Sequence, residues 1–332
     1  MSNEPKKTKR KDANNDKPSE QDKKEDAVPT ADDQNVKPKY GPYLTIPYQK
    51  VWSRSILILG VLVVVWYNST RGKEIALAKQ KDVLLSRTQY VDCSPEYKAE
   101  LDSYTGCMPE RCGRIVTDKL VTATETDVLL KIATNGINLG GSAGGASILD
   151  LHSGALSQGT GIVNIFTLEE ASKILNSADL AIYKVVKTKI QHAVSHHFGV
   201  DANRIYLTKP TFFSRMTNAP AKNVRDEYWL PHVDRVTYEW FHYTSLLYLN
   251  DYGRDFEGGR FVFVDENNVN STIEPRKGRV SMFTSGAENR HAVERVTSGT
   301  CYALTVSFTC DANAAIPDPK VNKNLQTNKL RE

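Results

Sequence analysis

Hydrophobic and polar positions divide the chain into a polar beginning, one apolar run and a long patterned remainder. Residues 1–50 are rich in Lys, Asp, Glu, Asn, Gln and Pro and poor in large apolar groups. Such a segment cannot bury enough surface to offset the entropy that it would lose on ordering. We therefore expect residues 1–50 to form a disordered polar tail, with folded structure beginning after it.

The apolar run at residues 51–67 predicts a membrane-spanning helix. Its central part, residues 56–67, carries no charge, and the full run of 17 residues would be about 25 Å long as a helix. A crossing prefers about 20 residues, so the run is short, but Arg54 near its start can snorkel toward the interface. Trp52 and Trp66 stand at its two ends, where interfacial aromatic residues belong. Because the polar segments on both sides offer no fold around it, we interpret the run as a signal anchor rather than a buried core element.

Basic residues near this anchor do not decide its orientation, since four lie on each side. The sequon Asn270-Ser271-Thr272 makes Asn270 a candidate glycosylation site. Three cysteines also gather between positions 93 and 112, as is typical of proteins in an oxidising lumen. We therefore expect a single-pass type II membrane glycoprotein of the endoplasmic reticulum or Golgi, with a cytosolic tail and a luminal C-terminal domain.

The cysteine spacing argues against a thiolate zinc site. The chain has five cysteines, at positions 93, 107, 112, 301 and 310, and no CxxC pair. In a lumen we expect one disulfide among the first three, whereas in a cytosol all would be free thiols. Because five is odd, at least one thiol stays unpaired unless a partner chain supplies its mate.

Between the anchor and residue 200 the pattern favours helices. We expect residues 68–122 to form a stalk with a cysteine-bearing segment, and the apolar periodicity of residues 73–87 suits a helix there. Residues 123–199 are expected to form a helical support region. Apolar residues recur every three or four positions along 168–198, and Gly199 stops that helix.

Two motifs in this region suggest ligand sites at first sight. The glycines between Gly140 and Gly145 lack the Lys-Ser/Thr ending of a phosphate loop, and no hydrophobic strand leads into them, so we expect a mobile loop. His192 and His196 are spaced i, i+4 on the predicted helix, but no Glu stands between them in the HExxH pattern. We interpret them as an exposed pair rather than a metal site.

After residue 200 the pattern changes to strands. Short β-branched or aromatic runs, separated by turn residues, occur at 204–207, 243–249, 260–264, 279–283 and 300–308. Strands that follow a run of helices indicate an α+β fold, with two sheets and helices packed on one face. We place this domain at residues 200–312 and treat residues 313–332 as a C-terminal tail.

Within the strand region, His232 and Asp234 form an HxD pair. On a strand, side chains at i and i+2 point to the same face, so one imidazole and one carboxylate can meet one ion. His291 follows Asp234 by 57 residues (291 − 234), enough for three or four strands to bring it alongside. Two imidazoles and one carboxylate leave three octahedral positions open, which suits Fe(II) in oxygenases. We therefore predict His232, Asp234 and His291 as metal ligands.

The surroundings of these residues resemble the prolyl 4-hydroxylase branch of the Fe(II)- and 2-oxoglutarate-dependent dioxygenases. The matching segments, in the order and spacing of that family, are residues 228–234, 244–251, 256–263, 275–280 and 291–296, with Phe283 and Gly299. The resemblance covers residues 200–312, about a third of the chain. It implies a double-stranded β-helix (jelly roll) with supporting helices, preceded by one transmembrane helix. It also implies that His232, Asp234 and His291 bind Fe(II), that 2-oxoglutarate is the co-substrate and that L-ascorbate keeps the iron reduced.

The activity implied by the resemblance is that of a membrane-anchored dioxygenase, an oxidoreductase that hydroxylates a protein or peptide side chain as prolyl hydroxylases do. The substrate itself cannot be deduced from the sequence. A nucleic-acid partner is not expected, because the net charge is only +4, from 43 basic and 39 acidic residues.

One position departs from the family. Ten residues after the distal His, where the family has Arg or Lys to hold the far carboxylate of 2-oxoglutarate, this chain has Cys301. Strand alternation should point Cys301 into the mouth of the domain, and a thiol cannot replace a forked guanidinium. Losing one partner of a buried ion pair costs about 3–5 kcal/mol.

Other cations would have to replace that anchor. Arg295 is a candidate for binding the co-substrate, and Lys209 and Arg215 are further candidates. The alternative interpretation is a catalytically weak or inactive jelly-roll binding module, of which Cys301 would be the signature.

Overall fold

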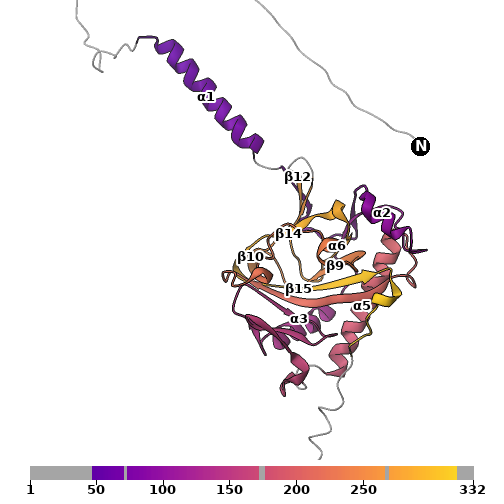
Figure 1. Ribbon diagram of the computed structural model, residues 1–332. Helices are drawn as coiled ribbons and strands as arrows, with labels where there is room; N and C mark the ends of the chain where they lie inside the picture. The colour runs from indigo at the N-terminus through magenta and orange to yellow at the C-terminus, as the bar shows by residue number, and fades with distance from the viewer. Residues whose placement is uncertain (1–46, 71–72, 172–175, 266–268, 320–332) are drawn as a thin grey trace, which may run out of the picture. The chain divides into compact units, whose positions relative to one another are not determined.

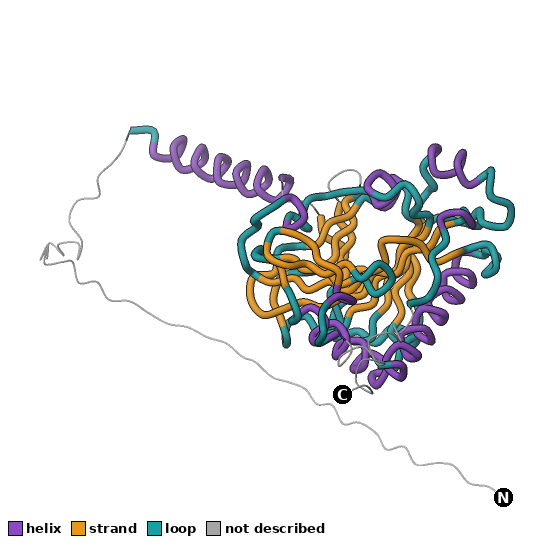
Figure 2. The backbone as a smooth tube through the Cα atoms, turned by 60° about the horizontal axis from the view of Figure 1, so that its bottom comes forward, coloured by secondary structure: helices purple, strands orange, loops and turns teal. Residues whose placement is uncertain are grey.

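The computed structural model describes residues 47–70, 73–171, 176–265 and 269–319. Most of the predicted tails at 1–50 and 313–332 therefore lies outside the described residues. The chain divides into two units, Met1–Val63 and Val64–Glu332. The ribbon and tube views show the second unit as a layered assembly of strands and helices (Figures 1 and 2).

A single helix, α1 (Gln49–Thr70), contains the apolar run. It is 22 residues long, or about 33 Å, which exceeds the predicted 51–67 because polar residues continue the helix at both ends. Its apolar side chains are exposed throughout, and the stretch Gln49–Ser69 is long and apolar enough to cross a membrane. Among the described residues, no other helix meets that description.

The helix expected at residues 73–87 is wrong. The chain instead forms β1 (Lys73–Ala78), which runs parallel to β12 (Val269–Ile273), and later β2 (Arg87–Tyr90), which pairs with β3 (Gly113–Thr117). A short apolar periodicity does not distinguish a helix from a strand, and here a partner nearly 200 residues away supplies the hydrogen bonds. Residues 73–90 therefore belong to the folded unit rather than to a stalk.

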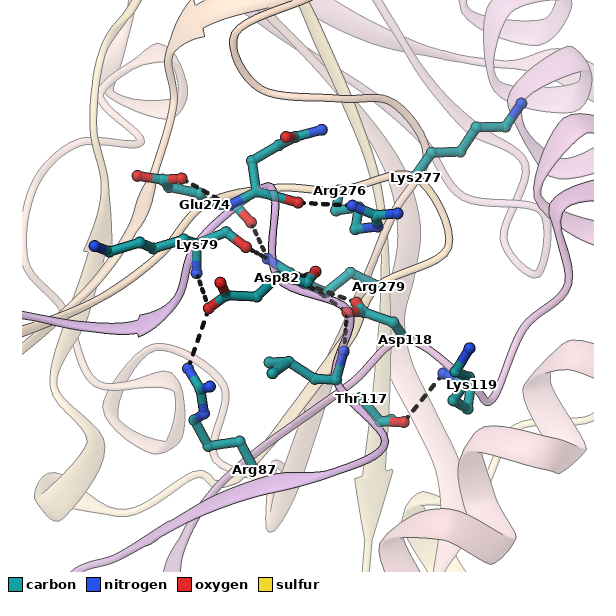
Figure 3. Close-up of polar contacts among 12 residues, drawn as sticks. Lys79, Asp82, Arg87, Thr117, Asp118, Lys119, Glu274, Arg276, Lys277 and Arg279 are labelled. Carbon is teal, nitrogen blue, oxygen red and sulfur yellow. Dashed lines mark hydrogen bonds and ion pairs between the residues drawn. The ribbon is translucent and has the colours of Figure 1, made fainter. Parts of the chain in front are cut away.

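A buried arginine holds the turn after β1 in place (Figure 3). The Arg279 side chain is fully buried and forms a two-pronged ion pair with Asp118, at 2.8 and 3.0 Å. Its remaining donors bind the carbonyls of Lys79, Asp82 and Glu274. The turn after β1 is thus fixed to the body of the domain by one guanidinium.

Two sheets form the body of the folded unit. The smaller sheet has the order β1-β12-β11-β14, with β11 at Phe261–Val264 and β14 at His291–Val293. The larger sheet has the order β2-β3-β13-β9-β15-β8-β5-β6-β4, while β10 pairs with β15 and β7 with β6. Its further strands are β13 (Val280–Thr284), β9 (Tyr243–Tyr248), β15 (Val296–Thr309), β8 (Tyr206–Thr217), β5 (Ala146–Leu149), β6 (Ala155–Gly159), β4 (Gly141–Ser142), β10 (Phe256–Gly258) and β7 (Gly161–Asn164).

The two sheets pack face to face, as in a jelly roll. Phe261, Phe263 and Ile273 of the smaller sheet share one buried cluster with Tyr248 and Phe283 of the larger sheet. The mixed α/β architecture agrees with the expected fold class. The predicted helical region at 123–199, however, contains β4 to β7 as well as helices, and these strands extend the larger sheet.

Helices cover the outer face of the larger sheet (Figures 1 and 2). These are α3 (Ala123–Ile137) and α5 (Ser177–Phe198), which share a buried cluster with β8, β9 and β15. The predicted apolar face of α5 is buried, and Gly199 ends the helix with a φ of 68°, as expected. The helix begins at Ser177 rather than near residue 168, because Asn176 caps it. The shorter helices are α2 (Pro95–Leu101), α6 (Asp234–Thr237), η1 (Ile165–Thr167), η2 (Val224–Asp226), η4 (Ala287–Asn289) and η5 (Ala312–Ala314).

The glycine-rich segment at 140–145 is held by Asp226 rather than standing free as expected. The buried Asp226 carboxylate accepts hydrogen bonds from the Ser142 hydroxyl and from the backbone N–H of Ala146. A Cβ atom at Gly144 would overlap that carboxylate. The glycines therefore allow a close approach between segments. His192 and His196 are exposed on α5, as predicted.

Two disulfides and one free thiol account for the five cysteines. Cys93 pairs with Cys112, which is the expected bond within the cysteine-bearing segment. Cys107 pairs with Cys310 at the end of β15, a pairing that the spacing did not indicate. Cys301 is free and buried.

Candidate metal centre

The three predicted ligands come from two backbone segments that lie side by side. His232 and His291 form an antiparallel bridge, in which each backbone N–H donates to the carbonyl of the other residue at 2.8 and 2.9 Å. Asp234 is the first residue of α6, so the HxD pair does not lie on a regular strand as expected. Val233 between the two residues is nevertheless extended, with φ −115° and ψ 124°, and this gives the same-face geometry.

The ligand atoms of this trio converge. Nε2 of His232 and Nε2 of His291 lie 3.7 and 3.6 Å from the same atom, Oδ1 of Asp234. One ligand atom from each residue can be chosen so that all lie within 4.8 Å of one another. Among the described residues this is the one group of three or more His, Cys, Asp or Glu side chains with such spacing.

Hydrogen bonds orient each ligand toward the common point. Nδ1 of His232 lies 3.1 Å from the carbonyl of Leu230, and Nδ1 of His291 lies 2.8 Å from the carbonyl of Asn289. Because a carbonyl can only accept, Nδ1 carries the proton in both rings, and each Nε2 presents its lone pair.

The carboxylate is oriented in the same way. Thr244 on β9 donates to Oδ2 of Asp234 at 2.6 Å, which leaves Oδ1 facing the two imidazoles. The Thr244 hydroxyl is itself paired with that of Ser285 at 2.8 Å. Asp234 and His291 are 6% and 4% exposed, so this carboxylate is positioned by a fixed, buried partner.

Burial also tunes His291. It lowers the pKa of the imidazole below its ordinary value, and the nearby Asp234 carboxylate opposes that shift. The ring packs on Phe261 with a centroid distance of 4.8 Å. His291 is therefore neutral near pH 7, the state in which an imidazole binds a metal ion.

The donor set fits a ferrous ion. Two imidazole nitrogens and one carboxylate oxygen form a facial arrangement that leaves positions open for a chelating co-substrate and for O₂. A structural zinc site would instead have a closed set of four ligands.

A cavity of about 330 Å³ opens beside these residues, between the two sheets. His232, Asp234 and His291 form part of its wall, and Phe261 of the smaller sheet and Thr244 of the larger sheet lie close to them. No Lys or Arg occurs among the described residues that line it. The cavity can hold a small organic molecule next to a metal ion, but its walls offer no cation.

Comparison with known proteins agrees with this geometry. Residues 220–309 match the sequence model of the 2OG-Fe(II) oxygenase superfamily. A protein of Xenopus tropicalis, 2-oxoglutarate and iron-dependent oxygenase domain-containing protein 3, is 51% identical over 245 residues, which cover 73% of this chain and 77% of the relative. The chain belongs to the 2OG-Fe(II) oxygenase superfamily.

Two further proteins are similar over smaller parts or at lower identity. Human prolyl 3-hydroxylase 2 is 45% identical over 76 residues, which cover 22% of this chain and 10% of that protein. A Trichoplax adhaerens prolyl hydroxylase, solved in complex with a hypoxia inducible factor oxygen degradation domain peptide fragment, is 14% identical. It covers 64% of this chain and 88% of that chain, with a TM-score of 0.42.

In this 2OG-Fe(II) oxygenase, one part of the cavity wall differs in character from the metal centre. We call it the Cys301 wall; it consists of the cavity-lining residues Tyr248, Cys301, Ala303 and Thr305 on β9 and β15. Cys301 is 1% exposed and packs against Met216, Phe256 and Val296. Burial raises the pKa of its thiol, so the thiol stays neutral. The expected inward direction of Cys301, Ala303 and Thr305 is thus confirmed.

Tyr248 presents an unused donor in this wall. Its hydroxyl is buried and makes no hydrogen bond within the described residues, and neither does the hydroxyl of neighbouring Ser281. A buried hydroxyl without a partner is costly, so an acceptor from a bound molecule would stabilise it.

The candidate substitute cations do not line the cavity. Arg295 is exposed, and its guanidinium stacks on the Trp229 ring at 3.8 Å. Lys209 is also exposed. Arg215 donates to Asn138 and, at 3.3 Å, to Ser147.

The candidate glycosylation site lies on an interior strand. Asn270 is half-buried on β12 and is paired with Glu74 of β1 on one side and Val264 of β11 on the other. The other two residues of the sequon, Ser271 and Thr272, are 1% and 2% exposed. Glycosylation at Asn270 stays a prediction.

Sequence reasoning missed the residues that support the ligands. These are Thr244, Ser285, Asn289 and the cavity hydroxyl of Tyr248. None belongs to a spaced motif of metal-ligand types. The one available signal was small polar residues inside otherwise apolar strands, such as Thr244 within the run 243–249.

Proposed function

We propose that this chain is a membrane-anchored Fe(II)- and 2-oxoglutarate-dependent dioxygenase that hydroxylates a protein or peptide side chain. The observation that carries the proposal is the convergence of His232, Asp234 and His291 on one point beside a cavity, with each ligand oriented by a hydrogen bond. Fe(II) bound there would supply oxidative decarboxylation of 2-oxoglutarate to succinate and CO₂, coupled to hydroxylation of a C–H bond.

The residues of the chain divide the work between binding and exclusion. His232, Asp234 and His291 would hold the metal. Tyr248 would donate its unused hydroxyl to the far carboxylate of 2-oxoglutarate, with Thr305 beside it on the Cys301 wall. The buried aromatic side chains near the ligands, such as Phe261, would keep bulk water away from the reacting groups. L-ascorbate would keep the iron ferrous.

A proline in a peptide is the acceptor that the relatives favour, since prolyl 3-hydroxylase 2 shares 45% identity over 76 residues. The entrance side of the metal centre supports a macromolecular acceptor. His232 has a half-open side chain, and next to the ligands Leu230 and Val236 are 50% and 84% exposed. Apolar side chains exposed beside an active site are typical of a surface that receives a partner.

A luminal location follows from the disulfides. Cys93–Cys112 and Cys107–Cys310 need an oxidising compartment, such as the endoplasmic reticulum or Golgi. With α1 as a signal anchor in the bilayer, a cytosolic N-terminal tail and a luminal oxygenase domain make the chain a type II membrane protein. This orientation would expose the Asn270 sequon to the glycosylation machinery, and a glycosidase-sensitive shift in mobility would report it.

The absence of a cation from the cavity wall supports an alternative. With Cys301 where a basic anchor is expected, the jelly roll would bind metal and a partner but turn over 2-oxoglutarate weakly or not at all. This second candidate keeps the metal centre and loses the co-substrate.

One experiment separates the two functions. The full chain, purified in detergent with Fe(II) and ascorbate, is incubated with 2-oxoglutarate and succinate is measured, with Asp234→Ala as the inactive control. Succinate above that control supports the dioxygenase. No succinate together with retained, stoichiometric iron supports the binding module, and no iron at all removes both.

A further inference from the structure

A second buried arginine lies behind the metal centre. Arg114 on β3 is 1% exposed. Its two terminal nitrogens bind both oxygens of Asp265, at 2.9 and 2.5 Å, and one of them also donates to the carbonyl of Glu288 at 3.0 Å. Its Nε donates to the side-chain oxygen of Asn289 at 2.7 Å. Arg114 therefore holds the turn η4 from two directions.

That turn carries the carbonyl that orients a metal ligand. Nδ1 of His291 donates to the carbonyl of Asn289 at 2.8 Å. The side-chain amide of Asn289 donates to the carbonyl and the hydroxyl of Thr284, at 2.7 and 2.8 Å, so the residue is fixed at both ends. The Arg114 guanidinium also lies 4.1 Å from the centroid of Phe263, a ring that contacts His291. One chain of contacts thus runs from Arg114 through Asn289 to the imidazole.

The support comes from a distant part of the chain. Arg114 precedes His291 by 177 residues (291 − 114) and lies outside the segment 220–309 that matches the superfamily. It follows Cys112, whose disulfide to Cys93 closes the segment 93–112. The backbone N–H of Ser94 in this segment donates to Glu288, the residue before Asn289.

We propose that Arg114 is a positioning residue for the metal centre: through Asn289 it sets the orientation of His291 and so the affinity for the metal ion. The inference rests on the proposed metal site and goes beyond it, because it assigns that role to a residue that touches neither metal nor substrate. Partners that orient a metal-bound imidazole typically affect metal affinity 10- to 100-fold when they are removed. Lysine cannot reproduce the effect, since one ammonium cannot replace a planar fork with donors on three sides.

The chain offers a matched control. Arg279 is equally buried and forms the same two-pronged pair with a carboxylate, that of Asp118 (Figure 3). Its other side-chain contacts go to the carbonyls of Lys79, Asp82 and Glu274, none of which touches a metal ligand. Arg279→Lys should therefore destabilise the fold about as much as Arg114→Lys without changing the metal centre.

The test compares Co(II) binding by the full chain in detergent, without oxygen or co-substrate. For Arg114→Lys we expect affinity about 10- to 100-fold below that of the unchanged protein, and altered visible absorption bands of bound Co(II). For Arg279→Lys we expect affinity within about threefold of the unchanged protein and the same bands. Thermal unfolding of both variants checks that each is folded.

A second pair of variants keeps the inference testable if the lysine variant does not fold. Asn289→Ala removes the link to the turn while leaving the Arg114–Asp265 pair, and we expect it to weaken Co(II) binding to a similar degree. Asn250→Ala is its control, because Asn250 is a buried asparagine whose side chain binds the backbone of Thr300 and Tyr302 instead.

The outcomes separate this inference from the proposed function. Equal Co(II) affinity and equal bands in the unchanged protein and in Arg114→Lys or Asn289→Ala overturn the positioning role and leave the proposed function standing. Equal losses in the Arg279 and Arg114 variants also overturn it, because a merely structural effect would explain both. Failure of the unchanged protein to bind Co(II) overturns the inference and the proposed function together.

Discussion

The metal centre and the Cys301 wall face one cavity but are built on opposite terms. At the metal centre, every ligand has a hydrogen-bond partner that selects its orientation, and Thr244 and Asn289 are themselves fixed by further partners. At the Cys301 wall, a neutral thiol packs among apolar side chains, and the Tyr248 hydroxyl has no partner. One region is complete before any ligand arrives, whereas the other lacks the group that would complete it.

The difference teaches that metal binding and co-substrate binding are separable in this chain. Pre-oriented ligands lose little freedom when an ion binds, so the metal centre should be strong without help from 2-oxoglutarate. A neutral wall gives no ion pair to a dicarboxylate, so the co-substrate should be held weakly. Substitutions in the two regions should therefore have distinct effects.

The largest effect is expected from His291→Ala. Removing one of three ligands should reduce iron content by more than about 100-fold in affinity, beyond what loss of a supporting partner causes. Metal analysis of the purified full chain measures it, with His192→Ala as the control for an exposed histidine. Normal iron content in His291→Ala would place the metal elsewhere.

Cys301→Arg should give the next largest change. A guanidinium at this position would form an ion pair with the far carboxylate of 2-oxoglutarate, worth about 3 kcal/mol or more, which is roughly 100-fold in affinity. Calorimetric titration of the Mn(II)-loaded protein with 2-oxoglutarate measures the gain, and Cys301→Ser controls for loss of the thiol. If the folded arginine variant binds no more tightly, a missing cation is not the defect of this wall.

Tyr248→Phe should weaken 2-oxoglutarate binding about tenfold, because a hydrogen bond to a charged group contributes about 1.5–3 kcal/mol. The same change should leave the stability of the ligand-free protein unaltered or slightly higher, since it removes a buried hydroxyl that has no partner. Titration and thermal unfolding together give both readouts. Tyr252→Phe, outside the cavity wall, is the control; a drop in ligand-free stability would show that the hydroxyl is already used.

The smallest effect is expected from Arg295→Ala. Because this side chain stacks on Trp229 at the surface, its loss should cost about 0.5–1 kcal/mol of stacking and change 2-oxoglutarate affinity by less than about threefold. The same titration tests it. A loss of tenfold or more would assign the anchor to Arg295 and remove the contrast between the two regions.

Much of the arrangement could be predicted from local pattern. The spacing of His232, Asp234 and His291 predicted a shared site, and the strand alternation around Cys301 predicted its direction. The burial of the α5 face followed from its periodicity, and its end followed from Gly199. In each case the information lies within a short window or a spacing, and the local geometry determines the outcome.

What could not be predicted depends on distant partners. Residues 73–78 are a strand because β12 supplies their hydrogen bonds, although the segment alone suits a helix. Asp234 begins a short helix, because the bridge between His232 and His291 already provides the convergence. Arg114 has no motif, and its role depends on a turn 174 residues later. Single-sequence reasoning has no access to such pairings.

The bond between Cys107 and Cys310 makes a covalent ring of the chain between them, with a sequence separation of 203. His232, Asp234 and His291 all lie within that ring. A protease cut at the exposed turn near Val224, which is 82% exposed, would therefore leave a nicked protein that migrates as one molecule until a reductant is added. Breaks in the polypeptide that would split another protein in two are tolerated here, and all three ligands stay on one connected molecule.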